Sequence, residues 1–416
     1  MDYFGKYDIF RDPVHGFIKV YEAERDLINT RAFQRLRRIK QLALTHYVYH
    51  GATHTRFGHS LGVMEVADRV FDIVINKDKY GDGILEWAGN EDEVRRKRVL
   101  LRLVALLHDL GHAPFSHVGE RLLPKDTSHE LMAAAIVRED SEIGQILDQV
   151  GVVNREDIAL FFEGTKLDQL VQQICMGPLD ADKIDYLLRD SLYTGVQYGR
   201  FDADRLLHMM CAVVHQCIED PTLGIEQGGV QAVEAMMLAR FSMFEQVYFH
   251  RIRRIYDIHL IDFLKSALPG GVFPINSNEY LNYDDLLFES RFGSSPPAEI
   301  NTAGTVTVLR DRKHFKVIRE TARYPLQVQI KVFRRNFEDL SHRFDGLKMD
   351  SVEEAPYKWT VEDNLIFVRT KNGLCEELIQ HGTYLDSLKP IKIFRIYSPR
   401  EIFSDVLRES ENMKWE

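Results

Sequence analysis

Cysteine is scarce in this chain. Only four occur in 416 residues (Cys175, Cys211, Cys217 and Cys375), and none are paired in a Cys-x-x-Cys spacing. This pattern argues against a disulfide framework or a thiolate metal site and favours a reducing compartment. Long apolar runs are also missing, since no uninterrupted stretch approaches the roughly 18 residues that span a bilayer. The first residues lack the basic region and apolar run of a secretory signal, so we expect a cytoplasmic protein without a membrane segment.

An excess of positive charge is absent as well. The chain has 53 Lys and Arg against 63 Asp and Glu, a net charge of −10, which argues against nucleic acid as a partner that coats the surface. With 45% hydrophobic and 28% charged residues it has the composition of a folded globular protein. The anomaly is histidine, because half of the 16 lie between positions 46 and 129. They are His46, His50, His54, His59, His108, His112, His117 and His129.

The apolar pattern predicts a mainly α chain. Two short strands are expected in residues 6–20 around a Pro- and Gly-containing turn, and helical spacing then continues to about residue 268. Val230 to Leu268 is the longest candidate helix, and Pro269 ends it. We therefore predict an all-helical core with a short N-terminal β-hairpin in residues 1–268.

The composition changes after this core. Residues 269–304 are rich in Pro, Gly, Ser and Asn, which predicts a linker-like region with at most a short helix at 283–287. Residues 305–416 are expected to form a smaller α+β region. Its predicted strands are 305–309, 325–332, 365–368 and 391–397, followed by a helix at 399–407.

A His-Asp pair follows the apolar run 99–107. An ionised Asp109 beside His108 at the end of a buried helix requires compensation, and a divalent cation is a common solution. Neighbouring helix residues point about 100° apart, so further ligands must come from elsewhere. His59, at the start of a helix, and Asp182, on another, complete a candidate metal set. Two imidazoles and two carboxylates suit one Mn²⁺, Fe²⁺, Mg²⁺ or Zn²⁺ ion.

The motifs around these residues resemble a known family. Residues 56–63, 108–117 and 180–190 are similar to the metal-binding segments of the HD-domain metal-dependent phosphohydrolases. Within that family, residues 12–16 and 33–42 resemble the deoxynucleoside triphosphate (dNTP) triphosphohydrolase branch, and the likeness extends over about residues 8–265. The resemblance implies hydrolysis of a dNTP to a deoxynucleoside and inorganic triphosphate, by attack of water on the α-phosphorus.

The resemblance also implies roles for individual residues. His117 and His129, the latter oriented by Glu130, would handle the proton of the leaving 5′-oxygen, and His112 would contact phosphate. The implied substrate contacts are Arg56, Lys183 and Arg240 with phosphates, Tyr186 with a phosphate or the sugar edge, Gln41 and Asp190 with the 3′-hydroxyl, and Leu42 and Tyr248 with the deoxyribose. Spacing supports part of this set independently, because Asp182, Tyr186 and Asp190 lie four residues apart on one helical face.

Oligomerisation is expected from the resemblance, as a dimer or a tetramer. Some members of the branch are activated by nucleotides at subunit interfaces, and Gln34 and Arg37 match that site. However, Asp8 stands where a phosphate-binding lysine is found and Asn29 where a guanine-reading acid is found. A carboxylate facing triphosphate is repulsive, so the sequence argues against this kind of nucleotide effector.

Two other interpretations stay open. One is an HD-type phosphohydrolase that acts on a nucleoside monophosphate, a cyclic nucleotide or an alarmone. The other is a nucleotide or single-stranded nucleic-acid binding protein without turnover, which the basic stretches 35–38, 95–98 and 251–254 motivate. The reaction products separate these cases, because release of pyrophosphate or monophosphate alone would contradict a triphosphohydrolase.

Overall fold

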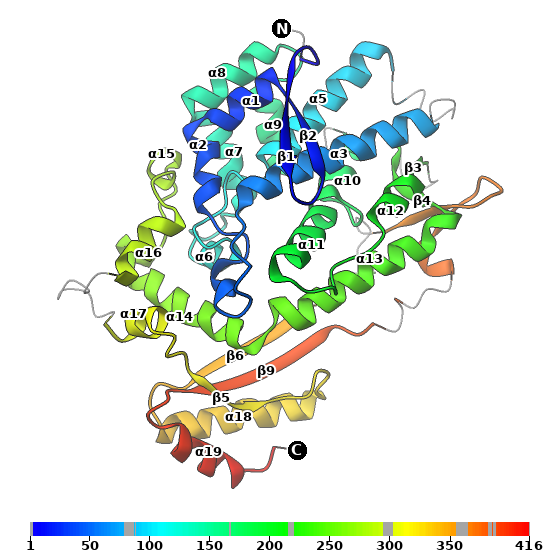
Figure 1. The fold of residues 1–416 in the computed structure, drawn as a ribbon. Coiled ribbons are helices and arrows are strands. Elements are labelled where there is room, and N and C mark those ends of the chain that lie inside the picture. Colours follow the sequence, from blue (N-terminus) through cyan, green and yellow to red (C-terminus); the bar gives the residue numbers. More distant parts are fainter. Residues whose placement is uncertain are drawn as a thin grey trace.

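The N-terminal β-hairpin and the helical core are confirmed (Figure 1). The computed structural model describes residues 3–78, 87, 89–165, 168–214, 220–293, 303–354, 365–381, 385 and 388–415. Strands β1 (Tyr7–Asp12) and β2 (Gly16–Tyr21) pair antiparallel, with Asp12 opposite Gly16 across the turn. Gly16 has a φ of +79°, a conformation that glycine adopts without strain.

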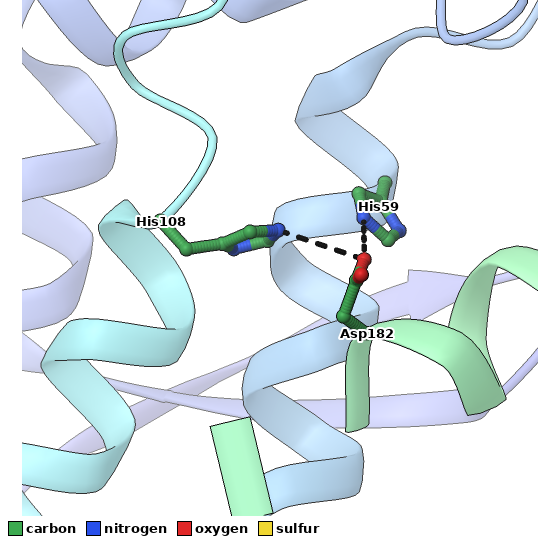
Figure 2. A group of neighbouring side chains, drawn as sticks. All are labelled: His59, His108 and Asp182. Carbon is green, nitrogen blue, oxygen red and sulfur yellow. Dashed lines mark ion pairs between the residues drawn. The ribbon is translucent and has the colours of Figure 1, made fainter. Parts of the chain in front are cut away.

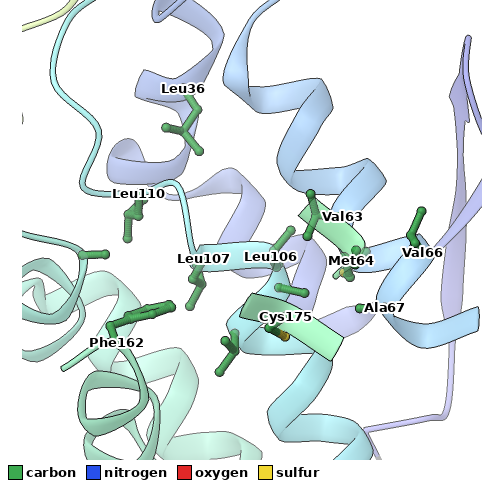
Figure 3. Close-up of a cluster of buried hydrophobic side chains, with 14 of the residues drawn as sticks. Leu36, Val63, Met64, Val66, Ala67, Leu106, Leu107, Leu110, Phe162 and Cys175 are labelled. Atoms are coloured by element: carbon green, nitrogen blue, oxygen red, sulfur yellow. The ribbon is translucent and has the colours of Figure 1, made fainter. Parts of the chain in front are cut away.

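One large apolar core is formed mainly by the helices of the first 210 residues, with contributions from later elements, and Figure 3 shows part of it. Its centre is the contact of α3 (Arg56–Asp78) with α5 (Glu91–Leu107), whose last nine residues, Val99 to Leu107, are all buried. The other elements are α1 (Glu22–Asn29), α2 (Arg31–Gln34), η1 (Arg35–Arg38), η2 (Ala43–Tyr47), α6 (His117–Glu120), α7 (His129–Glu139), α8 (Ser141–Val150), α9 (Arg155–Phe162), α10 (Gln169–Met176), α11 (Ala181–Thr194) and α12 (Ala203–Met209).

The predicted long helix at 230–268 is interrupted. Helix α13 (Val230–Met243) continues into a π-helical turn, η4 (Phe244–Tyr248), and a separate helix, α14 (Arg251–Ala267), then begins. The side chain of His250 accepts a hydrogen bond from the Ile252 backbone N–H and caps α14. Periodicity alone does not reveal such a break, because the apolar residues on both sides keep helical spacing.

The predicted linker-like region packs into the main core where the structure describes it. Its elements are η5 (Pro269–Gly271), α15 (Ser277–Tyr280) and α16 (Asp285–Gly293). Phe273, Tyr280 and Phe288 are buried there with the core residues of the preceding helices. The Pro- and Ser-rich stretch 294–302 lies outside the described residues, so the boundaries at 268 and 304 stay a prediction.

The C-terminal region mixes helices and strands as expected, although two predicted strands are wrong. Residues 305–309 lie in helix α17 (Ala303–Arg310), which packs on α14, and most of 325–332 lies in α18 (Gln327–Arg343). Strands β5 (Lys316–Glu320), β9 (Ile391–Ser398) and β6 (Lys348–Glu354) form an antiparallel sheet with β9 in the middle. Helices α18 and α19 (Phe403–Glu411) bury apolar residues with this sheet in a second, smaller core.

A second sheet joins the two parts of the chain. Strands β3 (Met210–Val213) and β4 (Thr222–Glu226) form a hairpin, η3 (Gln227–Gly229) follows, and β7 (Phe367–Arg369) pairs parallel to β4. Strand β8 (Cys375–Glu377) completes the order β3-β4-β7-β8, and η7 (Leu378–His381) comes next. Among the described helices, none combines the length and the apolarity that a bilayer-spanning segment needs.

Candidate active site

The four predicted metal ligands converge from three helices. His59 comes from the first turn of α3, His108 and Asp109 follow the end of α5, and Asp182 lies in the first turn of α11. Asp182 Oδ1 lies 2.9 Å from His59 Nε2 and 3.9 Å from His108 Nε2 (Figure 2). Asp109 lies 3.2 Å from His108 Nε2 and 3.8 Å from His59 Nε2. The sequence spacing therefore predicted a group that the fold brings together.

The donor atoms of this group fit a divalent cation. His108 Nδ1 lies 2.8 Å from the Ala105 carbonyl oxygen, and because a carbonyl only accepts, Nδ1 carries the hydrogen and Nε2 keeps its lone pair. His108 Nε2 is buried and has no hydrogen-bond partner among the described residues. A buried lone pair facing carboxylates is costly unless a cation or a proton occupies the space between them. Imidazole and carboxylate are ligands that Mn²⁺, Fe²⁺ and Zn²⁺ accept.

A fully buried carboxylate that was not predicted orients His59. Asp185 Oδ2 accepts from His59 Nδ1 at 2.7 Å, which directs Nε2 toward the ligand group. Asp185 also accepts from Arg189 at 2.8 and 2.9 Å and from His15 of the N-terminal hairpin at 2.6 Å. Burial by itself would raise the pKa of Asp185, but Arg189 and the two imidazoles hold it well below its usual range. A metal-binding histidine commonly donates its other nitrogen to such a carboxylate.

Two glycines, Gly62 and Gly111, allow close approaches around the ligand group. A Cβ at Gly62 would lie 1.9 Å from Asp185 Oδ1, and one at Gly111 would lie 2.0 Å from the His129 carbonyl oxygen. Gly111 thus lets α7 approach the loop that follows His108.

The predicted catalytic histidines form a second group beside the first. The rings of His112 and His129 stack with centroids 3.9 Å apart, and His117 lies 5.0 Å from His112. Glu120, which sequence reasoning missed, accepts from His129 Nδ1 at 2.5 Å and from His117 Nδ1 at 3.0 Å. The expected contact with Glu130 is present too, at 3.2 Å from His129 Nε2.

The pKa values of the two stacked rings are shifted in opposite directions. Burial, with the nearby Arg56 and His129, holds the pKa of His112 well below its usual range, so His112 is neutral at neutral pH. Burial also disfavours the charged form of His129, but Glu120 and Glu130 outweigh it and raise the pKa of His129. The surroundings therefore favour the neutral form of His112 and the charged form of His129, which are the forms suited to hydrogen bonding and to proton donation.

Arg56 links the ligand group to a strained loop. Its guanidinium donates to both oxygens of Asp109 at 2.8 Å and to Ser116 Oγ at 2.8 Å. Phe115 and Ser116 both have positive φ, 60° and 56°, and the Ser116 hydroxyl donates to the Lys40 carbonyl at 2.6 Å. Non-glycine residues in this region are strained and need support from their surroundings.

That support comes from a residue in the predicted linker-like region. Asp285 accepts from the backbone N–H of Phe115 at 2.7 Å and from that of Lys40 at 2.9 Å. It is 1% exposed, and burial raises its pKa to about 7. The single carboxylate joins the loop that leads to His117 with the segment that leads to Gln41.

A cavity of about 560 Å³ lies beside both groups. It also extends along α14, whose residues Arg253, Arg254 and Asp257 were not predicted. The predicted residues that line it are Gln41, Leu42, Arg56, His108, Asp109, His112, His117, His129, Glu130, Asp182, Tyr186, Asp190 and Tyr248.

Three predicted residues do not line this cavity in the described part of the chain. His59 is buried behind the ligand group. Lys183 Nζ donates to Asp180 at 2.5 Å and to the Gly177 carbonyl at 3.0 Å, and Arg240 Nε donates to Tyr186 Oη at 3.2 Å. The phosphate-binding role of Lys183 and Arg240 stays a prediction that requires these side chains to change partners.

Asp190 already has two partners. Its oxygens accept from Tyr248 Oη at 2.6 Å and lie 2.7 Å from His54 Nε2. His54 had no predicted role, and its ring also stacks on Tyr193. The contacts with His54 and Tyr248 hold this buried carboxylate at the cavity wall. Each carboxylate oxygen can accept more than one hydrogen bond, so Asp190 can still accept from a ligand.

A mixed His and Asp group on a helical core is typical of metal-dependent hydrolases. The HD domain family matches residues 56–176, and the HD-associated region family matches residues 201–341. The chain is 40% identical to the Bacillus subtilis protein YwfO, over 97% of this chain and 94% of that one. The chain belongs to the HD-domain phosphohydrolase family.

Two further relatives bear on the fold and the site. A crystal structure of a hypothetical protein from Aquifex aeolicus superposes with a TM-score of 0.80 at 32% identity, over 97% of this chain and all of that one. The human deoxynucleoside triphosphate triphosphohydrolase SAMHD1 is 27% identical over 93% of this chain and 66% of its own length. HD domains are metal-dependent, and the His59, His108 and Asp182 group fits such a requirement.

Proposed function

We propose that this protein hydrolyses deoxynucleoside triphosphates to deoxynucleosides and inorganic triphosphate. The observation that carries the proposal is the unpartnered Nε2 of His108, which lies with Asp109 and Asp182 at the wall of a cavity of nucleotide size. His59 lies behind them. The name of the relative SAMHD1 supports the substrate class. Leu42 and Tyr248 on the same cavity support a deoxyribose, because a close ring wall leaves no room for a 2′-hydroxyl.

The four converging side chains would hold one divalent ion, with His59 and His108 offering Nε2 and Asp109 and Asp182 offering carboxylate oxygens. Such an ion supplies positive charge to a phosphate oxygen and makes a water molecule more acidic. Asp185 orients His59, and the Ala105 carbonyl orients His108, so both lone pairs point to one place. Arg56 keeps Asp109 ionised, since its guanidinium lowers the pKa of this buried carboxyl.

In the reaction, a water oxygen bonds to the α-phosphorus while the water gives up one proton to solvent, and the bond from phosphorus to the 5′-oxygen breaks. Triphosphate leaves with the new oxygen, and the 5′-oxygen of the deoxynucleoside takes up a proton. The His129 imidazolium, held by Glu120 and Glu130, is our first candidate for the donor of this proton, and His117 on the same Glu120 is the second. Neutral His112 would hydrogen-bond a phosphate oxygen.

Product analysis tests the proposal. Protein supplied with Mn²⁺ or Mg²⁺ is incubated with each dNTP alone and with pairs of dNTPs, and deoxynucleoside and triphosphate are quantified. We expect equal amounts of both products, and loss of turnover in His108→Ala. Release of pyrophosphate with a monophosphate would instead indicate another HD-type phosphohydrolase. Binding without turnover, unchanged in His108→Ala, would favour a nucleotide-binding protein.

Hydrolysis of single dNTPs would show that no nucleotide effector is required, as the charge of Asp8 predicts. Activity only with mixtures would contradict that prediction. The mass of the protein in solution, measured with and without dNTP, tests the predicted homodimer or homotetramer. The identity of the native metal is tested in the same assay by comparing ions.

A further inference from the structure

One wall of the cavity takes no part in the chemistry described above. Helix α14 contributes Arg253, Arg254 and Asp257 to this wall, and Arg121, at the C-terminal end of α6, adds a third guanidinium. Three guanidinium groups suit a pocket that is expected to bind an anion, but the carboxylate among them is unusual. The free hydrogen-bonding groups of this wall indicate what it binds.

Asp257 is a buried carboxylate with unused acceptor capacity. It is 2% exposed, and its Oδ1 has no hydrogen-bond partner among the described residues. Its Oδ2 lies 3.7 Å from Arg253 and 3.8 Å from Arg254, which is beyond hydrogen-bond length. A buried acceptor without a donor is costly, so a ligand that offers N–H groups would satisfy it.

The guanidinium of Arg121 is the hydrogen-bond donor of this wall that is free to bind a ligand. Arg254 is bound to Asp350 of β6 at 2.6 Å, and Arg253 donates to Thr45 Oγ1 at 3.1 Å and to the Tyr248 carbonyl oxygen. The side chain of Arg121 makes neither a hydrogen bond nor an ion pair within the part of the chain that the structure describes. The charged groups that act on its guanidinium are Arg254, Asp257, Asp350 and Arg253.

The position of this wall points to the base of a nucleotide. Arg253 binds the backbone of Tyr248, which we place against the deoxyribose, so the wall adjoins the sugar position. Among the described residues, no hydrogen bond or ion pair joins Arg121 or Asp257 to any of the four metal-ligand residues. The base is attached to the sugar at C1′, on the side away from the 5′-phosphates, so the wall beyond Tyr248 faces the base. A phosphate here would meet the Asp257 carboxylate, and it has no N–H group to satisfy the unpartnered Oδ1.

We propose that Asp257 and Arg121 recognise the nucleobase and favour guanine, an inference that rests on the proposed function. Guanine offers two adjacent N–H donors, N1–H and the 2-amino group, which match the two oxygens of a carboxylate. It also offers carbonyl O6 beside them as an acceptor for a guanidinium. Adenine, cytosine and thymine each lack the pair of adjacent donors. Guanine therefore satisfies both unused groups of the wall at once.

The test compares dGTP with dATP. We measure kcat/KM for both nucleotides in the wild type, Asp257→Asn, Arg121→Ala and the control Asp262→Asn, which changes a half-exposed carboxylate on the same helix outside the cavity. The wild type should prefer dGTP, and the ratio of dGTP to dATP rates should fall about tenfold in Asp257→Asn and in Arg121→Ala. Asp262→Asn should keep the wild-type ratio.

Each other outcome has a definite meaning. Equal rates for dGTP and dATP in the wild type, or equal losses for both in the variants, would overturn base recognition while leaving triphosphohydrolysis intact. Arg121 is exposed, so its variant keeps the test valid if Asp257→Asn does not fold. If the wild type hydrolyses no dNTP, the proposed function fails, and base recognition is tested by calorimetric binding of dGTP and dATP. Tighter binding of dGTP that is lost in Arg121→Ala would support base recognition. Equal binding would overturn it.

Discussion

Replacing Asp185 by Asn tests whether a carboxylate outside the ligand group controls metal affinity. Asn keeps the size of the side chain but places an amide N–H₂ where one oxygen accepted. Asp185 accepts from Arg189 through both oxygens, at 2.8 and 2.9 Å, and from one imidazole on each oxygen. The amide must therefore oppose at least two donors, whichever way it is turned.

The magnitude follows from burial. Removing one partner of a buried ion pair costs about 3–5 kcal/mol. Arg189 also donates to Asp12 at 3.0 and 3.2 Å, so its charge is not left alone, and we expect about 3 kcal/mol of lost stability. Loss of the carboxylate that orients a metal-binding histidine weakens metal affinity by about 10- to 100-fold.

Two assays separate these effects. Urea unfolding in the presence of a chelator gives the free energy of unfolding, and calorimetric titration of the folded variant with Mn²⁺ gives the metal affinity. The control Asp204→Asn removes an exposed partner of Arg69 and should change stability by less than about 0.5 kcal/mol. A folded Asp185→Asn protein that binds Mn²⁺ as tightly as the wild type would refute the reasoning.

Three other predictions follow from buried groups and from the proposed metal. Burial lowers the pKa of His259 to about 4 from 6.5, so the unfolded chain binds a proton that the folded protein excludes between these values. Stability should therefore rise with pH across about 4 to 6.5, by up to about 3 kcal/mol, and His259→Gln should flatten this part of the unfolding profile. Asp285→Ala should leave the N–H groups of Phe115 and Lys40 without an acceptor, lowering stability by about 2–4 kcal/mol and kcat more than the affinity for substrate. A chelator should abolish hydrolysis and lower Tm, since a ligand bound only by the folded state stabilises it.

Each of these has an outcome that contradicts it. An unchanged pH profile in His259→Gln would show that another group causes the acid sensitivity. An Asp285→Ala protein with wild-type kcat would show that the strained loop does not need its hydrogen bond to Asp285. Full activity after prolonged chelation, with metal content verified by elemental analysis, would contradict the assignment of the ligand group.

Much of the candidate site could be predicted because its residues have regular local spacing. Asp182, Tyr186 and Asp190 repeat every four residues, and all three line the cavity, as one face of α11 requires. His108 and Asp109 come after an apolar run and lie at the end of a buried helix. Local rules of this kind need only helix geometry.

Prediction failed where local preference and packing disagree. Residues 325–332 include the β-branched Val328, Ile330 and Val332, yet α18 forms. Its residues Ile330, Phe333 and Leu340 lie on one helical face that covers the β5-β9-β6 sheet. Propensity differences are worth less than about 1 kcal/mol per residue, so the burial of such a face outweighs them. The same reason explains α17 on α14.

The sequence by itself determined the type of site, because histidines and carboxylates at these spacings have few other uses in a buried helical core. Only the tertiary structure decided which groups support it. Asp185 and His15 are 170 residues apart, as are Asp285 and Phe115, and Arg253 and Thr45 are separated by 208 residues. No periodicity extends over such separations, so contacts of this length exist only once the helices are packed. The proposed base-recognising wall depends on these contacts as well, since α6 and α14 meet only in the folded chain.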